Sequence, residues 1–438
     1  MTRTTLHSTD RKKIGLALFV AALLMGIALP VHAVTEITLW HDWGGQGGEV
    51  IARIVETFEA QNPDIIVHVD IVPDMNDKLL VALMGGVAPD VVLLDRWLTS
   101  SFAAQGALVA LDPYIARDGV NPDDYFPATW EEATYRGTSY GIPFNTDTRA
   151  LLYHASMFAE AGLDPDRPPS TWDDLWEITP RLTRRTASGE LLQVGYVPHH
   201  GHGGFVHYLW QNGGSVLNED HTEVTFHGVE GEEALQFMFD FVEWYGGMAA
   251  LDAFNQTIVA QGPLPALLAG RQAIIYEGNW HLGSFRENFP EFYANDLRVA
   301  LPPMNKNRAT LSGGFALALP SSTRGEQLEA AWRLIRYLTS EEPQLTLGVE
   351  MGVIPANRHA AVHPDFMDDE IKRVFIESVQ YARFRTNHPA YPRIEGVLQG
   401  PMQSAVLNRE MSIRAALEDA ARQTQLMLDE VNEVLASF

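Results

Sequence analysis

Cysteine is absent from all 438 residues of this sequence. The chain therefore holds itself together without disulfides, and it lacks the thiolate ligands of the common structural zinc sites. It also lacks the cysteine that lipid-anchored bacterial exoproteins carry at their cleavage site. We therefore expect a free protein that an outer membrane retains, in the periplasm of a Gram-negative-type cell.

Long apolar runs are also scarce, because only residues 14–29 form one. This run is shorter than the roughly 20 residues that a helix needs to cross a bilayer. Basic residues precede it, and Pro30 and then Val31-His32-Ala33 follow it, which is the design of a cleavable secretory signal. We predict a signal peptide at residues 1–33 and a soluble, secreted remainder.

Basic residues are fewer than acidic ones. The sequence has 31 Lys and Arg and 56 Asp and Glu, which gives a formal net charge of −25. Residues 1–33 carry four basic residues and one acidic residue, so their removal takes the net charge to −28. Such a surface repels nucleic acid and anionic lipid. The residues after position 33 exceed the roughly 250–300 at which single cores stop growing, so two lobes are expected.

The N-terminal part of the secreted chain alternates strand and helix patterns. β-prone runs at 36–40, 67–71 and 91–94 are separated by apolar residues at helical spacing over 50–58 and 75–84. This order predicts an α/β fold with a mostly parallel sheet flanked by helices. Ligands bind at the carboxyl ends of strands in such sheets, so the loops after Trp40 and Leu94 are candidates for the site.

The remainder continues with both kinds of element and without a Gly/Ser-rich linker. We therefore expect the chain to cross between the lobes on several short segments. Ser170 is the expected cap of a helix that begins at Thr171, with Asp173 at the capping-box position. Further strands are expected at 150–153, 193–197, 273–276 and 315–319, and helices at 229–244, 326–338 and 411–435.

Three sequence patterns could indicate catalysis or a metal site, but each fits another role better. Gly137 to Gly141 matches the G-x-S-x-G nucleophile elbow, but the Pro143 that follows favours a hairpin. The adjacent carboxylates of Glu131 and Glu132 do not face each other across a substrate. The histidines of the 199–207 segment have no cysteine partners, so we expect a flexible polar loop over 199–204. No catalytic residue, metal or cofactor is predicted.

Aromatic residues at predicted strand ends and glycine-rich turns point to another chemistry. A sugar presents an apolar C–H face and a rim of hydroxyls, which suit a flat ring with charged or amide groups beside it. Trp40 and Trp210 are interpreted as core residues, whereas Gly278 and Asn279 place Trp280 in a loop. The glycine-rich segment 44–48 fits either close approach to a ligand or simple turn geometry. The polar groups near these aromatics are Asp42, Asp95, Arg96, Asn145 and Asp147.

Taken together, these segments resemble the family-one extracellular solute-binding proteins of ABC importers, the relatives of maltose-binding protein. The resemblance rests on the order and spacing of segments 37–45, 58–63, 88–92, 140–147, 169–174, 270–274, 278–280, 313–315 and 331–341. It implies two α/β lobes, each a mostly parallel sheet flanked by helices, joined by a multi-strand hinge. Lobe 1 is expected at 34–146 plus 302–353, and lobe 2 at 147–301 plus 354–438, with crossings near 143–149, 300–301 and 353–355.

The resemblance also implies site residues and partners. Asp95 and Arg96 match the pair that grips sugar hydroxyls, Asp147 matches a cleft carboxylate, and Trp280 matches a stacking ring. The full set of expected ligand-binding residues is Asp42, Trp43, Gly44, Asp95, Arg96, Asn145, Asp147, His202, Trp280, Gly314 and Arg385. The expected protein is a monomer that binds a mono- or oligosaccharide, closes around it and delivers it to the permease subunits of an ABC transporter.

Two other functions remain open at this point. A binder of glycerol phosphate or a glycerophosphodiester would use Arg383, Arg385 or Arg393 to hold the phosphate. A secreted enzyme acting on glycans would need two carboxylates roughly 5–10 Å apart across a glycosidic bond, and the sequence offers no motif for them.

Overall fold

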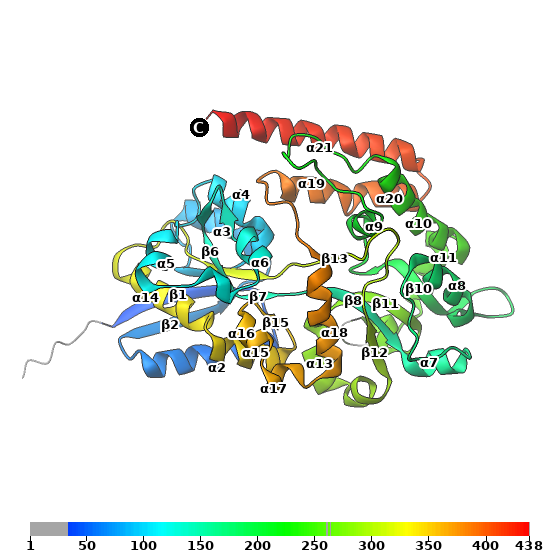
Figure 1. Cartoon of the computed structure of the whole chain (residues 1–438), viewed down its shortest axis with the longest axis horizontal. Helices are drawn as coiled ribbons and strands as arrows, with labels where there is room; N and C mark the ends of the chain where they lie inside the picture. The colour runs from blue at the N-terminus through cyan, green and yellow to red at the C-terminus, as the bar shows by residue number, and fades with distance from the viewer. Residues whose placement is uncertain (1–33, 260–261, 263, 438) are drawn as a thin grey trace, which may run out of the picture.

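Two five-stranded sheets, each covered by helices, make up the computed structural model (Figure 1). The structure describes residues 34–259, 262 and 264–437, so the predicted signal peptide at 1–33 lies outside the described residues. Within the described residues, no helix is both long and apolar enough to cross a membrane. We call each sheet with its covering helices a lobe, and the predicted two-lobed α/β fold is confirmed.

The sheet of lobe 1 has the strand order β2-β1-β3-β14-β6. Its strands are β1 (Thr35–His41), β2 (Ile65–Ile71), β3 (Val91–Asp95), β6 (Gly141–Pro143) and β14 (Phe315–Ala318). The first three are parallel, as the sequence predicted, and β14 is antiparallel to β3 and β6. A strand presents alternate residues to opposite faces, so Leu93 and Leu94 join two different cores.

The helices of lobe 1 cover both of these faces. Helix α2 (Gln46–Gln61) packs through Val50, Ile54 and Phe58 onto one face together with α14 (Gly325–Leu338). Helix α3 (Met75–Gly85) packs onto the other face through Met75 and Leu79. The other helices of this lobe are α4 (Thr99–Ala104), α5 (Asp112–Asp118), α6 (Pro127–Glu132) and α15 (Glu341–Met351). The segment around Gly137 is a hairpin of β4 (Thr134–Tyr135) and β5 (Thr138–Ser139), so that prediction is confirmed.

The sheet of lobe 2 has the order β12-β8-β11-β10-β9 and is mixed, so the expectation of a mostly parallel sheet is wrong for this lobe. Its strands are β8 (Arg149–His154), β9 (Arg184–Arg185), β10 (Leu191–Gly201), β11 (Gln272–Gly278) and β12 (Leu297–Ala300). Strands β10 and β11 are parallel, and β8 is antiparallel to β11 and β12. One face packs against α8 (Trp172–Leu182), α9 (Phe205–Gln211), α10 (Val229–Tyr245), α19 (Tyr391–Leu398), α20 (Pro401–Leu407) and α21 (Ile413–Ala436). The long C-terminal α21 runs along the edge of the molecule beside α19 (Figure 1).

The other face of this sheet packs against α12 (Pro265–Leu268), α13 (Leu282–Asn288), α17 (Pro364–Met367) and α18 (Glu370–Ser378). The remaining helices are α7 (Ala155–Glu160), α11 (Met248–Gln256) and α16 (Arg358–Ala361). The remaining short strands are β7 (Asn145–Thr146) with β15 (Ile354–Pro355), and β13 (Thr310–Leu311) with β16 (Ala382–Arg383).

Two local predictions in lobe 2 were wrong. The cap of α8 is Thr171, and Asp174 completes the capping box, one residue later than Ser170 and Asp173. The expected loop over 199–204 is shorter, because β10 extends to Gly201. Gly201 pairs with Tyr276 of β11, so the neighbouring strand supplies the pairing that the His/Gly-rich sequence did not predict.

The chain passes between the two sheets near the predicted crossings. Strand β7 follows β6 of lobe 1 and leads directly into β8 of lobe 2. It pairs antiparallel with β15, where the chain leaves α15. A further crossing joins β12 of lobe 2 to β14 of lobe 1. Hinges consist of a few loop or element-terminal residues, and these short crossing segments are of that kind.

Candidate functional site

A cavity of about 710 Å³ lies between the two lobes, at the carboxyl ends of β1 and β11. A larger hollow of about 1110 Å³ on the outer flank of lobe 2, beside α8 and α10, contains none of the predicted site residues. The cleft cavity contains seven of them, which favours it as the site. Its lining is Asp42, Trp43, Gly44, Gly45, Gln46, Gly47, Asn145, Asp147, Arg149, His202, Trp280, Ser284, Glu287, Asn288, Phe315, Met351 and Val353.

The loop after β1 supplies the lobe 1 side of this cavity. The Trp43 ring packs on Phe144, with centroids 5.7 Å apart, and meets Phe315 edge-on at 5.3 Å. Asp42 has a buried Oδ1 atom that no group of the described chain hydrogen-bonds, and burial raises the pKa of this carboxyl. A buried acceptor without a donor is costly, so Asp42 is suited to accept a hydrogen bond from a ligand.

Close packing fixes the start of α2 beside this loop. A β-carbon added at Gly48 would lie 2.9 Å from the carbonyl oxygen of Trp43, and one at Gly47 would lie 3.0 Å from the methyl carbon of Met351. Glycine therefore allows the helix to approach the loop that carries Asp42 and Trp43. Gly44 has open space around it, which is consistent with simple turn geometry at that position.

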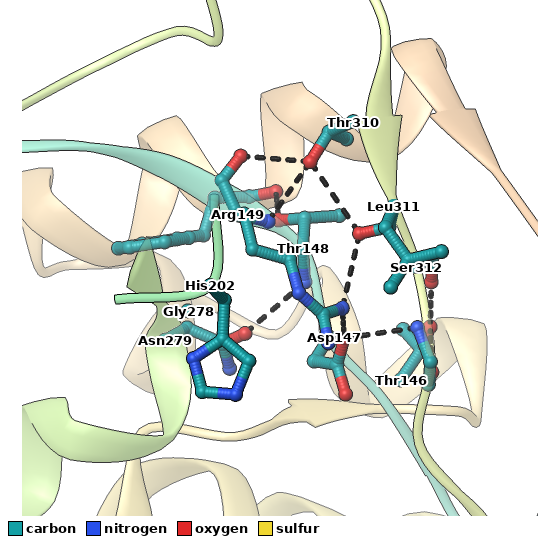
Figure 2. A network of polar contacts seen from close by, with 12 residues as sticks. Thr146, Asp147, Thr148, Arg149, His202, Gly278, Asn279, Thr310, Leu311 and Ser312 are labelled. Carbon is teal, nitrogen blue, oxygen red and sulfur yellow. Dashed lines mark hydrogen bonds and ion pairs between the residues drawn. The ribbon is translucent and has the colours of Figure 1, made fainter. Parts of the chain in front are cut away.

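An ion pair between Asp147 and Arg149 lines the cleft cavity, and Figure 2 shows its polar contacts. Asp147 Oδ1 also accepts a hydrogen bond of 2.9 Å from the backbone N–H of Gly313, and Arg149 Nη1 donates to the carbonyl oxygen of Leu311 at 3.0 Å. The guanidinium lies 4.9 Å from the centre of the Trp280 ring. Arg149 thus holds both the cleft carboxylate and the cleft aromatic ring in place.

His202 forms the edge of the cavity on the lobe 2 side. Its Nδ1 lies 2.6 Å from Glu277 Oε1, and its ring meets Trp280 edge-on at 4.7 Å. The Glu277 side chain is buried, and its Oε1 also accepts from the backbone N–H of Gly278 at 2.8 Å. The side chain of His202 remains half exposed, so it is accessible to a ligand.

Arg96 was expected among the ligand-binding residues, but it does not line the cleft cavity. Its side chain is fully buried, and it donates to Glu132 at 3.0 Å and to the carbonyl oxygens of Asn145 and Gly313. Asn145 and Gly313 belong to two of the segments that connect the lobes, and Glu132 is the last residue of α6. A buried arginine needs such partners for its donors, and here the protein itself provides them. Arg96 therefore cross-links the scaffold under the cleft.

Three more predicted residues lie outside the cleft cavity. Asp95 accepts from Asn76 at 3.2 Å, and burial raises the pKa of its carboxyl to about 6. Gly314 adopts φ +117°, and a β-carbon there would lie 2.5 Å from the Asn145 carbonyl oxygen, so it serves a tight turn. Arg385 pairs with Glu395 at 2.6 Å and lines an adjoining cavity.

Several lining residues were missed by sequence reasoning. Ser284, Glu287 and Asn288 belong to α13, which follows Trp280 by one residue, so their helical spacing is a signal that could have identified them. The sequence analysis predicted Arg149 only as the last residue of the crossing segment 143–149. Its role depends on Asp147 and on Leu311, which lies 162 positions further along the chain, and no local pattern indicates such a pairing.

The histidines of segment 199–207 lie on different elements. His199 and His200 lie on β10, and His207 lies on α9. Burial lowers the pKa of His199 to about 3. Among the residues that the structure describes, no group of three or more His, Asp or Glu could hold a metal ion.

Comparisons with known proteins identify the family. Residues 44–345 match the family model of bacterial extracellular solute-binding proteins, and the chain belongs to this family. A maltotriose-binding protein of Pyrococcus abyssi is 25% identical over 373 residues, which cover 83% of this chain and 76% of that protein.

Two further similarities cover different shares of the chain. A solute-binding protein of an ABC transporter from Thermotoga lettingae, solved with alpha-D-tagatose bound, aligns with a TM-score of 0.77 and 29% identity. The alignment covers 90% of this chain and all of that one. The sn-glycerol-3-phosphate-binding periplasmic protein UgpB of Shigella flexneri is 29% identical over 185 residues, 40% of this chain and 41% of that protein.

Proposed function

We propose that this chain is the extracytoplasmic substrate-binding component of an ABC sugar importer. It binds a mono- or oligosaccharide in the cleft and delivers it to the membrane permease. The observation that carries the proposal is the cleft cavity itself, where Trp43 and Trp280 lie beside the carboxylates and amides of Asp42, Asn145 and Asp147. Aromatic rings suit the C–H face of a sugar, and ionised acceptors form the stronger hydrogen bonds to its hydroxyls.

Charge favours a neutral sugar over a phosphorylated ligand. Arg149 is the one Lys or Arg among the described residues that line the cleft cavity, and Asp147 neutralises it. Asp42 and Glu287 add negative charge to the same lining. A phosphate carries about −1.5 to −2 charges at neutral pH and would have no free cation to meet it there.

The three arginines considered for phosphate binding are engaged elsewhere. Arg383 donates to the carbonyl oxygen of Gly214, and Arg393 pairs with Glu430 on the surface. Arg385 pairs with Glu395 beside the adjoining cavity. These contacts support sugar binding over glycerol phosphate binding.

The proposal includes the lobe boundaries, the cellular location and the oligomeric state of the protein, and the absence of catalysis. We assign 34–146 plus 302–353 to lobe 1 and 147–301 plus 354–438 to lobe 2. The protein is exported by a signal peptide at 1–33, acts as a monomer in the periplasm and has no catalytic activity. The relatives with which it shares its family are binding proteins, which supports the last point.

A calorimetric screen tests the function directly. Purified protein is titrated with a library of neutral mono- and oligosaccharides and with glycerol 3-phosphate. We expect at least one neutral sugar to bind and glycerol 3-phosphate not to bind. A ligand at 100 times its Kd adds about 2.7 kcal/mol to the free energy of unfolding, so a thermal-shift screen can precede calorimetry. Binding of glycerol 3-phosphate alone would reject the sugar proposal.

The absence of catalysis needs its own assay. Any oligosaccharide that binds is incubated with the protein for hours, and the mixture is analysed by chromatography. We expect the sugar to be recovered intact. Cleavage products that disappear in the Asp147→Asn variant would contradict a purely binding role.

A further inference from the structure

A second cavity of about 420 Å³ adjoins the cleft cavity inside lobe 2. Arg149 and His202 line both cavities, so the two spaces meet at these side chains. The second cavity lies between the end of β10, helix α9 and helices α19 and α20. Its volume falls in the range of about 300–1,000 Å³ that is usual for small-ligand pockets.

The lining of this second cavity combines hydrogen-bonding groups with a small apolar surface. Imidazole, amide and hydroxyl groups dominate, and Met248, Leu311 and Leu407 supply the apolar part. The polar members are Arg149, His199, His202, His207, Arg385, Glu395, Gln399, Gln403, Ser404 and Asn408. Such a mixture matches a polyhydroxylated group that has one C–H face.

His207 provides an independent indication that something binds there. Its side chain is almost fully buried, and neither ring nitrogen has a hydrogen-bond partner within the described chain. Nδ1 of His199, which lines the same cavity, also has no such partner. Unpaired polar atoms in the interior are costly, and native proteins retain few of them without a reason.

The protonation state of His207 fits a hydroxyl-bearing partner. Burial lowers the pKa of this imidazole well below its usual value, which favours the neutral ring. A neutral imidazole has one nitrogen that donates and one that accepts. Two sugar hydroxyls can satisfy both atoms, because a hydroxyl can act as donor or as acceptor.

The ion pairs argue against an anion in this cavity. Arg385 Nε lies 2.6 Å from Glu395 Oε2, and Asp147 neutralises Arg149. The buried carboxylate of Glu277 lies beside His202 at the entrance. A neutral group is therefore favoured over a phosphate or a carboxylate.

We propose that the second cavity is a binding subsite for a further sugar unit of a ligand whose first unit occupies the cleft cavity. This inference rests on the proposed function and deepens it, because it assigns a di- or longer oligosaccharide as the preferred ligand. His207 and Gln399 form its polar wall, and Leu407 forms its apolar surface.

Two variants test the subsite. Ser404→Trp fills the cavity from an exposed position on α20, and His207→Phe removes both ring nitrogens at nearly constant size. Gln423→Trp on the exposed face of α21 is the matched control for Ser404→Trp. Calorimetry with glucose, maltose and maltotriose, and with mannose, mannobiose and mannotriose, measures how affinity depends on ligand length.

In the series that binds, we expect the disaccharide to bind the unchanged protein at least about tenfold more tightly than the monosaccharide, or about 1.4 kcal/mol. Ser404→Trp and His207→Phe should remove this gain and leave monosaccharide affinity unchanged, while Gln423→Trp retains it. Equal affinity for mono- and disaccharide, or a full gain in Ser404→Trp, would overturn the subsite and leave the proposed function standing. If neither these six sugars nor any other neutral sugar of the library binds, the proposed function fails and the subsite fails with it.

Discussion

Trp280 and Trp40 are two tryptophans near strand ends that have different surroundings. Trp280 lines the cleft between Arg149 and His202, whereas Trp40 lies on β1 and packs against the core beside α3. We predict that Trp280→Ala weakens sugar binding about tenfold or more, because the variant loses the buried area of the ring as well as the about 0.5–1.5 kcal/mol that aromatic contacts contribute beyond area burial. Trp40→Ala should lower the melting temperature with little effect on affinity. Calorimetry and thermal unfolding of both variants check this, and unchanged affinity in Trp280→Ala would reject its role in the site.

Glu132 gives a second prediction at the residue scale. It is buried beside Arg96, and burial raises the pKa of its carboxyl to about 7 from an ordinary value of 4.5. The folded state then holds a proton that the unfolded state loses between these values, so this group's contribution to stability decreases as pH rises through that window. We predict that Glu132→Gln, which cannot ionise, gains melting temperature relative to the unchanged protein between pH 5 and pH 8.

The exposed neighbour Glu131 provides the control for this measurement. Glu131→Gln should show a difference in melting temperature that is flat with pH. If the difference for Glu132→Gln is equally flat, the buried carboxyl does not titrate in this range.

The start of helix α2 gives a prediction at the scale of an element. Alanine is favoured over glycine in a helix by about 0.5–1 kcal/mol. However, a β-carbon at Gly48 would lie 2.9 Å from both the Trp43 carbonyl oxygen and the Ile71 side chain, and overpacking costs about 1–3 kcal/mol. The clash should prevail, so we predict that Gly48→Ala lowers both the melting temperature and the sugar affinity, because the loop with Asp42 must shift.

Gly44→Ala is the control for this prediction. A β-carbon there meets nothing within 4 Å, so Gly44→Ala should leave the melting temperature unchanged. A melting temperature for Gly48→Ala equal to or above that of the unchanged protein would show that the helix start can move away from the loop without cost.

At the scale of the whole molecule, we expect the two lobes to close around a ligand. Its lobes are joined by short segments, two of which pair as β7 and β15, and the cleft cavity has walls from both lobes. Hinged proteins of this design close on their ligands. We predict that the radius of gyration from small-angle X-ray scattering decreases when a sugar that binds is added to saturation. A sugar that does not bind in the calorimetric screen, added at the same concentration, is the control, and superimposable curves with and without the binding sugar would contradict closure.

At the same scale, the sequence predicted the fold class well. The alternation of strands and helices over residues 36–94 is a local signal, and β1, β2, β3, α2 and α3 lie where it indicated. The length of β10 was missed, because its last residues are histidine and glycine and extend only through pairing with β11.

The sequence by itself determined the strand ends and the aromatic and polar residues that follow them, because hydrophobic periodicity and turn residues act within a few positions. Asp42, Trp43, Asn145, Asp147 and Trp280, which line the cleft cavity, were predicted in this way or through the resemblance. Only the tertiary structure decided which charged residues face the cleft. Arg96 is buried because carbonyl groups 49 and 217 positions away surround its guanidinium, and Arg149 enters the cleft because Leu311 and Trp280 hold it there. The partners of a buried charge come from distant parts of the chain, so its role depends on how the two lobes assemble around it.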